Sequence, residues 1–415
     1  MMSVTAKMIV DGSVLEGGGQ ILRNSVAYSA LLRKPIAIEN IRQNRKPPGL
    51  KPQHAAGTPG SLFKLAMLSH TIAKGLRLAA HICSGQLTGC EPKSTSIDLV
   101  PGQIQTPGSY TADPGTAGST TLLLQISYPC LVFSQASEPS EITVRGGTNA
   151  AQAPQIDYTD QVFLPFLRQH LGLAPKLTIR RRGYYPRGGG EVHLNIPPTR
   201  GPLPPVNLTE RGAVKYIFGR AYVAGYPARM ADEIRAAAVD NLVSAGLDPK
   251  IIRIDSVRER DTEAFGKGSG VVLWAETEGG CRLGGSSSGL RGQSLASLGD
   301  AAASELVRNI DHGGCVDEYL QVWLVMSPRC IRLIVYSGPN HNFPRSSERD
   351  IKGPHRAFDT AHKVSIPILT DRHLAEGITR TAMHIAELFT DAKFTVEDLN
   401  DGTTLLTCEG IGYTA

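Results

Sequence analysis

Short runs of β-branched and aromatic residues alternate along the chain with longer, helix-favouring segments. QILRNSVAYSALL (20–32) spaces its apolar residues close to one face of a helix, and GSTTLLLQISYPCLVF (118–133) is apolar enough for a buried helix or core segment. The strand candidates are PIAIENI (35–41), SEITVRGG (140–147), EVHLNI (191–196) and GVVLWAET (270–277). This alternation predicts an α/β or α+β fold.

A stretch rich in Pro and Gly divides the chain. PPTRGPLPPVN (197–207) is typical of a linker, and the residues that follow, up to about 309, have the pattern of a separate βαβ-rich unit. We therefore expect three segments, at 6–204, 205–309 and 310–415. A triple glycine precedes an ordered segment twice, in LEGGGQIL near the start and in PRGGGEVHL (186–194), which hints at repeated units.

Composition narrows the class of protein. With 415 residues and 41% hydrophobic content, the chain can bury the cores of two or three domains. Its net charge of +5 permits an anionic partner without requiring one. No apolar run reaches the roughly 18 residues of a membrane helix, and the N-terminus lacks the order of a signal peptide, so we expect an intracellular protein without a membrane partner. The seven cysteines are scattered and never form a CxxC pair, which argues against a disulfide framework or a zinc site.

The segment DGSVLEGGGQILR (11–23) brings three glycines to a helix start. Its backbone N–H groups and the Arg23 guanidinium could face a phosphate, while the Glu16 carboxylate could hold a metal. The segment is neither a Walker loop nor a dinucleotide fingerprint, so a tight turn that leads into a helix explains it equally well.

A basic, proline-stiffened loop follows, IRQNRKPPGLKPQH (41–54). It gathers Arg42, Arg45, Lys46, Lys51 and His54, and forked guanidiniums match phosphate oxygens, although a solvated loop would look the same. Two further segments, RGGTNAAQAPQIDY (145–158) and RRRGYYPRGGGEV (180–192), add Gly, Arg and Tyr positions suited to close backbone approach. Each alone could be a hairpin turn, and only their joint occurrence is informative.

In this order, these segments resemble the RNA 3'-terminal phosphate cyclase family. The resemblance covers most of the chain and rests on DGSVLEGGGQILR, GLKPQH, CSGQLTGCEPKSTSI, TADPGTAGSTTLLLQ, GGTNAAQAPQIDY, RGYYPRGGGEV, NLTERG, GSSSGLRG, HGGCVDEYLQ, TAMHIAELF and CEGIGYT. It implies repeated units of a four-stranded sheet with two helices, interrupted by a small inserted α/β domain. It also implies an ATP- and metal-dependent conversion of an RNA 3'-phosphate into a 2',3'-cyclic phosphate, with release of AMP and pyrophosphate.

The resemblance assigns phosphate and metal roles to the N-terminal motifs. Glu16 matches the family's metal-side carboxylate, for Mg2+ or Mn2+. The cationic positions that face phosphates are matched by Arg23, Arg42 and Arg45. The matching PQH element contributes Gln53 and His54.

The nucleotide pocket is implied in the same way. Gln125, Pro154 and Tyr319 match positions that line the ATP site. The implied partners are RNA 3' ends, with no DNA partner, and the implied location is the nucleus, with the cytoplasm also open. The resemblance leaves the RNA substrates and the oligomeric state undefined.

The chain departs from the family pattern at the nucleophile. A histidine that accepts AMP should lie six residues before His384, but that position is Ile378, and isoleucine cannot accept AMP. After DEYLQ, the family's Asp-Gln pair is replaced by Val322 and Trp323. Helix periodicity also ends at Val322 in the sequence, and the runs 322–376 and 58–75 match nothing in the family.

Two explanations of the unmatched runs compete: a genuine isoform or diverged paralogue, and an error in the gene model. Their abrupt boundaries favour the second. For function, the alternative to an active cyclase is a catalytically inactive relative that binds RNA in ribosome biogenesis, and Ile378 points toward it. A sugar-phosphate or enolpyruvyl transferase of related architecture fits the repeats but not the specific blocks.

Overall fold

The structure is a computed structural model of the 415-residue chain. It describes residues 7–15, 18–44, 48–50, 61–133, 136–150, 153–199, 203–204, 206–289, 292–325, 333–337, 371–398 and 404–409.

The first unit is a four-stranded sheet with two helices. In chain order its elements are β1 (Met8–Asp11), α1 (Gly19–Leu32), β2 (Ile36–Glu39), α2 (Ser61–Ile82), β3 (Gln86–Thr88) and β4 (Ile97–Val100). The strand order is β1-β2-β4-β3, with β1 and β2 parallel and β4 antiparallel to both of its neighbours. The buried side chains of β2 and β4 alternate with more exposed ones, as expected where one face of a sheet packs on helices.

The second unit repeats this topology. Its elements are β5 (Ser109–Ala112), α3 (Thr120–Val132), β6 (Ser140–Gly146), α4 (Ile156–Tyr158), the π-helical turn η1 (Thr159–Phe163), α5 (Leu164–Leu171), β7 (Lys176–Gly183) and β8 (Gly190–Ile196). The order β5-β6-β8-β7 has the same parallel and antiparallel pairings as the first sheet. The short strand β12 (Ala264–Phe265), from a later part of the chain, adds to the β7 edge.

The third unit is split along the chain. It contains β9 (Val206–Leu208), α8 (Glu318–Val325), β15 (Leu333–Ser337), α9 (Asp371–Phe389), β16 (Lys393–Asp398) and β17 (Thr404–Glu409). The order β9-β15-β17-β16 again pairs the first two strands in parallel and the others antiparallel. The expected repeats of a four-stranded sheet with two helices are therefore confirmed.

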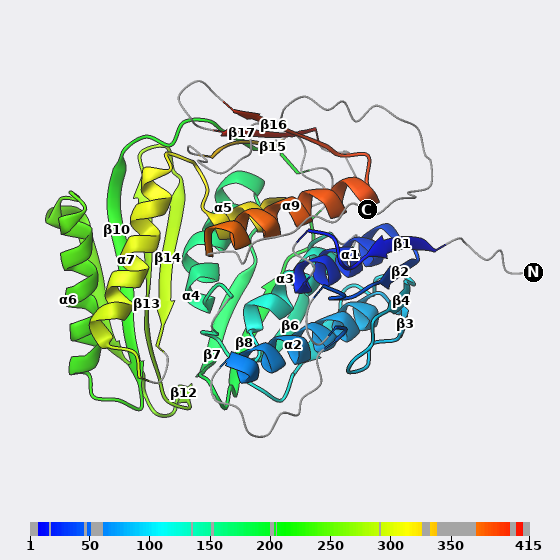
Figure 1. The fold of residues 1–415 in the computed structure, drawn as a ribbon, viewed down its shortest axis with the longest axis horizontal. Helices are drawn as coiled ribbons and strands as arrows, with labels where there is room; N and C mark the ends of the chain where they lie inside the picture. The colour runs from blue at the N-terminus through cyan, green and yellow to red at the C-terminus, as the bar shows by residue number, and fades with distance from the viewer. Residues whose placement is uncertain are drawn as a thin grey trace, which may run out of the picture.

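A fourth sheet interrupts the third unit between β9 and α8. Its elements are β10 (Val214–Ala224), α6 (Arg229–Ser244), the 3-10 turn η2 (Pro249–Ile251), β11 (Ile252–Arg258), β13 (Gly268–Thr277), β14 (Arg282–Ser288) and α7 (Leu295–Asp311). The order is β11-β10-β13-β14, and α6 and α7 lie side by side on one face (Figure 1). The first element of the inserted unit is β10, from Val214, and the last is α7, to Asp311, while β9 pairs with β15 of the third unit. The bounds 205 and 309 stay a prediction.

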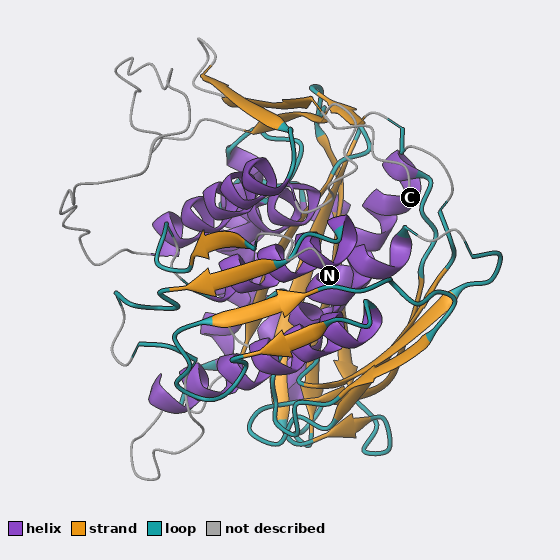
Figure 2. Ribbon diagram, turned by 90° about the vertical axis from the view of Figure 1, so that its right-hand side faces the viewer, coloured by secondary structure: helices purple, strands orange, loops and turns teal. Residues whose placement is uncertain are grey.

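Helices from different units pack between the sheets, as Figure 2 shows. Tyr28 of α1 stacks on Phe389 of α9, with ring centroids 5.7 Å apart. Phe163 of the second unit packs against Trp323 of α8 at 4.1 Å. The apolar core of the insert, by contrast, is formed by its own strands and by α6 and α7. The repeats therefore share their cores, whereas the insert has one of its own.

Both runs that look foreign in the sequence contribute to this packing. Helix α8 continues past Val322 to Val325, and Val322, Trp323 and Leu324 are buried, so the predicted loss of helix at Val322 is wrong. Tertiary burial outweighs the modest helix propensity of β-branched and aromatic residues. Helix α2 covers 61–82 and lies so close to α3 that a Cβ on Gly75 would come within 2.1 Å of Ile126 Cδ1. A helix packed on more than one side does not show a simple amphipathic period.

Candidate functional site

A buried polar contact joins the first two repeats at Arg23. Arg23 belongs to α1 and is 7% exposed. Its Nε donates a hydrogen bond to Oε1 of Gln125 in α3, at 2.8 Å. Arg23 Nη2 donates to Oε1 of Gln20 at 2.5 Å, and Gln20 Nε2 in turn donates to Asn24 Oδ1 at 2.7 Å. The Gln125 and Gln20 amide oxygens orient the guanidinium. Two predicted site residues, Arg23 and Gln125, are therefore in direct contact.

Gly19, the last residue of the triple glycine, makes room for this arginine. A Cβ on Gly19 would lie 2.8 Å from Arg23 Nη1 and 2.6 Å from Cδ1 of Ile72. A larger residue at this position would therefore displace the guanidinium from the start of α1. Gly19 therefore allows Arg23 to take its position. The sequence predicted a tight turn or a phosphate-binding segment here, but not this role of the glycine.

The start of α3, the helix that carries Gln125, contacts Pro154. Ser119 caps the helix, because its Oγ accepts a hydrogen bond from Leu122 N at 3.3 Å. Thr121, one turn before Gln125, donates through Oγ1 to the carbonyl oxygen of Pro154 at 2.8 Å. The segment around Pro154 is thus fixed to the helix that carries Gln125.

Tyr319 lies in the first turn of α8 and is held by Asp317. Asp317 Oδ1 accepts hydrogen bonds from the Tyr158 hydroxyl at 2.6 Å and from the backbone N–H groups of Leu320 and Tyr319 at 2.9 and 3.1 Å. Its Oδ2 accepts from Gly284 N of the insert at 2.7 Å. Burial raises the pKa of Asp317 to about 6. Asp317 thus caps the first turn of α8, and its contacts to the second repeat and the insert had no sequence signal.

Three glycine segments pack together, backbone against backbone, beside the start of α3. A Cβ on Gly147 would lie 2.5 Å from the carbonyl oxygen of Ala117, and one on Gly188 would lie 2.5 Å from that of Thr116. Gly183 would meet the Gly146 carbonyl oxygen at 2.3 Å. The predicted close backbone approach is therefore correct, and the hairpin at 184–189 is one of its components.

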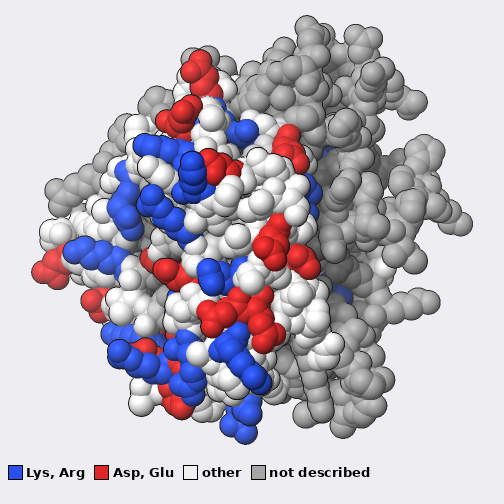
Figure 3. Space-filling model, turned by 90° about the vertical axis from the view of Figure 1, so that its left-hand side faces the viewer, with Lys and Arg blue, Asp and Glu red and all other residues white. Residues whose placement is uncertain are grey.

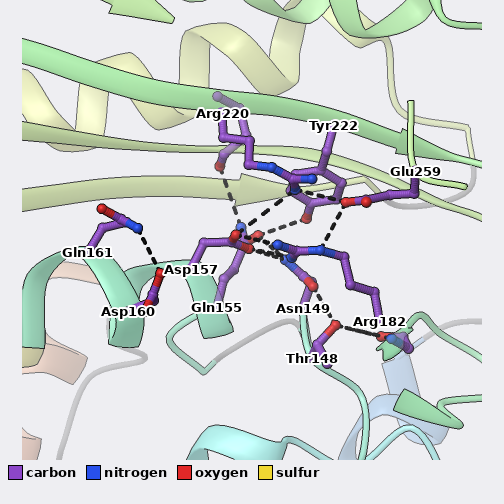
Figure 4. Close-up of polar contacts among 12 residues, drawn as sticks. Thr148, Asn149, Gln155, Asp157, Asp160, Gln161, Arg182, Arg220, Tyr222 and Glu259 are labelled. Carbon is purple, nitrogen blue, oxygen red and sulfur yellow. Dashed lines mark hydrogen bonds and ion pairs between the residues drawn. The ribbon is translucent and has the colours of Figure 1, made fainter. Parts of the chain in front are cut away.

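A buried ionic network joins the second repeat to the insert (Figure 4). Arg182 of β7 donates through Nη1 and Nη2 to the two carboxylate oxygens of Asp157, each at 2.7 Å, and its Nε lies 3.0 Å from Glu259 Oε1. Arg220 of β10 donates to the same Glu259 oxygen at 2.8 Å. Burial opposes the ionisation of Asp157, but Arg182 and Arg220 outweigh it and lower the pKa of Asp157. Sequence reasoning missed this network, because Glu259 lies 77 residues from Arg182 along the chain.

The position expected to hold the nucleophile lies on α9, which packs against α1. Ile378 is half-buried and His384, which marks the motif, is exposed. Lys34 Nζ donates to the carbonyl oxygen of Phe389 at 2.7 Å and fixes the end of α9 to the end of α1. An aliphatic side chain therefore occupies this position on a helix that is anchored to the one carrying Arg23.

The remaining predicted residues divide into two groups. Arg42 is buried and adopts a left-handed backbone conformation, with φ of 56°. The others lie outside the described residues: Glu16, Arg45, Gln53 and His54. Within the described ranges, no group of three His, Cys, Asp or Glu side chains is arranged to hold a metal ion. Nor does any helix in those ranges have the length and apolarity needed to cross a membrane.

The fold is a repeat-built α/β protein: three repeats share one topology, and an α/β unit is inserted into the third. The candidate site lies where helices of different repeats meet through polar contacts. The chain belongs to the RNA 3'-terminal phosphate cyclase family, whose model matches residues 14–59 and 68–332. The matched segments include 58–59, 68–75 and 322–332, which we had placed outside the family pattern. Those parts of the two runs are therefore not foreign to the family.

Curated relatives agree with this assignment. The chain is 33% identical, over 97% of its length, to a probable RNA 3'-terminal phosphate cyclase of Dictyostelium discoideum, of which it covers 83%. It is 37% identical over 76% of its length to an RNA 3'-terminal phosphate cyclase of Staphylothermus marinus and covers 82% of that protein. With the corresponding protein of Methanosarcina barkeri the identity is 39% over 76% of the chain, with 84% of the relative covered.

Proposed function

We propose that this protein binds RNA 3'-phosphate ends and ATP where its repeats meet, and that it does not itself form the covalent adenylate of an ATP-dependent cyclase. The observation that carries the proposal is the Arg23–Gln125 contact, which holds a buried guanidinium between two repeats at the residues expected to face phosphate and nucleotide. A guanidinium fixed in place by amides recognises phosphate oxygens at little further entropic cost.

The reaction of the lineage explains why these residues lie together. A phosphate monoester is a poor electrophile, so ATP first transfers AMP to a nucleophile and pyrophosphate leaves. AMP then passes to the RNA 3'-phosphate. The neighbouring 2'-hydroxyl attacks that phosphorus, AMP departs with the electrons of the broken P–O bond, and the hydroxyl proton is lost. Intramolecular attack benefits from a high effective molarity. In this scheme, Arg23 holds phosphate oxygens, and Gln125, Pro154 and Tyr319 surround the nucleotide.

Ile378 removes the covalent step from this chain. Its side chain has no lone pair with which to attack the α-phosphorus of ATP, and losing a covalent route costs orders of magnitude in rate. The Asp-Gln pair expected after Gln321 is also absent. Val322 and Trp323 occupy its positions; both are buried, and Trp323 belongs to the apolar core. The same observations favour the second candidate function, a non-catalytic RNA-binding member of the family.

A divalent metal, Mg2+ or Mn2+, belongs to the proposal through Glu16. This carboxylate precedes the helix that carries Arg23, and such a metal would neutralise phosphate charge beside the guanidinium. The nuclear location expected from the resemblance is likewise retained as a proposal.

Binding measurements test the proposal. We expect the protein to bind a single-stranded RNA with a 3'-phosphate about tenfold more tightly than the same RNA with a 3'-hydroxyl, since one charge-assisted contact contributes about 1.5–3 kcal/mol. The variant Arg23→Gln should lose this preference, whereas Arg33→Gln, an exposed arginine at the other end of α1, should keep it. Equal affinity of the native protein for the two RNAs would rule the proposal out.

A further inference from the structure

Three aromatic side chains are exposed where the insert meets the second repeat. Tyr185 is 44% exposed, Tyr226 36% and Phe265 39%, although large aromatic residues are normally mostly buried. They come from the β7–β8 hairpin, from the loop after β10 and from β12. Phe265 lies in β12, the short strand that extends the second sheet. Its carbonyl oxygen accepts a hydrogen bond from Tyr184 N at 3.1 Å. We call this region the aromatic–cationic surface.

Cationic side chains lie directly over these rings. The guanidinium carbon of Arg181 is 5.4 Å from the centre of the Phe265 ring, and Lys267 Nζ is 5.6 Å from that of Tyr226. Arg258 donates to the carbonyl oxygen of Tyr226 at 3.2 Å. Among the described residues, no carboxylate lies within ion-pair distance of Arg181 or Lys267. The surface therefore combines stacking platforms with uncompensated positive charge.

Figure 3 shows the molecule from the side of the insert. Lys and Arg side chains gather in the upper left and in the lower part of this face, and Asp and Glu side chains lie at its top, among them and between them. The strand β12 lies at the lower end of the insert in Figure 1. Arg258 and Arg260 are paired with Asp261 and Glu263, so Arg181, Arg187 and Lys267 supply the unpaired charge at this end.

The aromatic–cationic surface adjoins the glycine segments beside the start of α3. Gly188 and Gly189, in the hairpin that carries Tyr185, touch both regions: a Cβ on Gly188 would meet the backbone of Thr116 and Ala117, and one on Gly189 would meet the Phe265 ring. Residues 115–119 lead directly into α3, which carries Gln125. The hairpin therefore lies between the segment that leads into α3 and the Phe265 ring.

We propose that the aromatic–cationic surface binds the single-stranded RNA that precedes the 3' end. Bases replace Arg181 and Lys267 over the Phe265 and Tyr226 rings, and the two displaced cations contact the phosphates. This inference rests on the proposed function, because it takes the RNA terminus to lie at Arg23 and Gln125. Aromatic platforms with basic neighbours bind single strands with little sequence preference, since every base has a stacking face. Duplex RNA keeps its bases stacked within the helix and cannot use such platforms.

Fluorescence anisotropy with 3'-phosphorylated oligouridylates tests the inference. The native protein should bind a dodecamer about tenfold or more tightly than a trimer, because base stacking on one aromatic residue accounts for about a 5- to 100-fold change. The double variant Phe265→Ala/Tyr226→Ala should lose this length advantage and bind the trimer as before. Val243→Ala, which alters a 38% exposed residue of α6, serves as the matched control and should keep it.

Charge reversal gives an independent reading if the alanine variants are unstable. Arg181→Glu/Lys267→Glu should weaken dodecamer binding and flatten its salt dependence, by about 0.7 in the slope of log K against log [salt] for each lost phosphate contact. A length advantage that survives both double variants would overturn the inference. Loss of the advantage together with an intact preference for the 3'-phosphate supports both proposals. If the variants lose the length advantage but the native protein binds RNA with a 3'-phosphate and with a 3'-hydroxyl equally, the RNA-binding role of the surface is supported and the proposed function is refuted.

Discussion

Arg181 and Arg182 are neighbours in β7, yet they lie in opposite environments. Arg182 is buried and contacts the carboxylates of Asp157 and Glu259, whereas Arg181 is exposed and lies over Phe265. A buried charge must be paired, because desolvation costs several kcal/mol per ion, while an exposed charge contributes little to stability. The comparison separates an arginine that joins two parts of the fold from one that is available to a ligand.

The largest effect is expected from removing the buried member of the pair. Arg182→Met leaves Asp157 without its bidentate partner and should lower the free energy of unfolding by about 3–5 kcal/mol. Arg181→Met, in the next residue, should change it by no more than about 0.5 kcal/mol. Urea unfolding followed by circular dichroism measures both variants. Similar losses in the two would show that the network does not hold the insert to the second repeat.

The next largest effect on stability is expected in the hairpin at 184–189, which follows Arg181 and Arg182. Gly188 and Gly172 have nearly the same positive φ, 66° and 64°, but only Gly188 is packed against backbone, 2.5 Å from the Thr116 carbonyl oxygen. Gly172→Ala should therefore cost only the left-handed strain of about 1–2 kcal/mol. Gly188→Ala should add a steric cost of about 1–3 kcal/mol. Equal destabilisation, measured by thermal unfolding, would mean that the hairpin moves away from residues 115–119 without penalty.

A third contrast concerns buried carboxylates. The arginines lower the pKa of Asp157, whereas burial, reinforced by Glu318, raises the pKa of Glu305 in α7 to about 8. The folded protein thus holds a proton on Glu305 that the unfolded chain, with its pKa near 4.5, releases, so this residue makes stability fall as pH rises from about 4.5 to 8.

Glu305→Gln should flatten that decline. After allowance for partial exposure, we expect the difference in stability between pH 5 and pH 8 to shrink by about 1–2 kcal/mol. Chemical denaturation at a series of pH values gives the slope, with Glu278→Gln, an exposed residue of the insert, as the control. An unchanged slope in Glu305→Gln would place the titrating group elsewhere.

Sequence patterns predicted the fold class, and the family resemblance predicted the repeats and the insert. The resemblance named Arg23 and Gln125 for separate roles, and the hydrogen bond between them had no sequence signal. The orientation of the arginine run at 180–182 could not be predicted. A register shift in β7 between Ile179 and Arg181 breaks the strict alternation of a strand, so Arg180 and Arg181 both face solvent and Arg182 faces inward. The network partners were also beyond prediction, because Glu259 reaches Arg182 only through the docking of the insert. Local propensity ends α8 too early, at Val322, because the burial that extends the helix to Val325 has no local signal.

The most direct test of the account is a search for a covalent adenylate. The native protein is incubated with α-labelled ATP and Mg2+ or Mn2+ and then denatured, and the chain is assayed for acid-labile, base-stable label, with Ile378→His treated in parallel. The account predicts no label on the native chain, because the position on α9 that should carry the nucleophile is aliphatic, and it predicts that any label gained by Ile378→His maps to residue 378. Label on the native chain that maps to a histidine would contradict the account and show that another residue performs the covalent step.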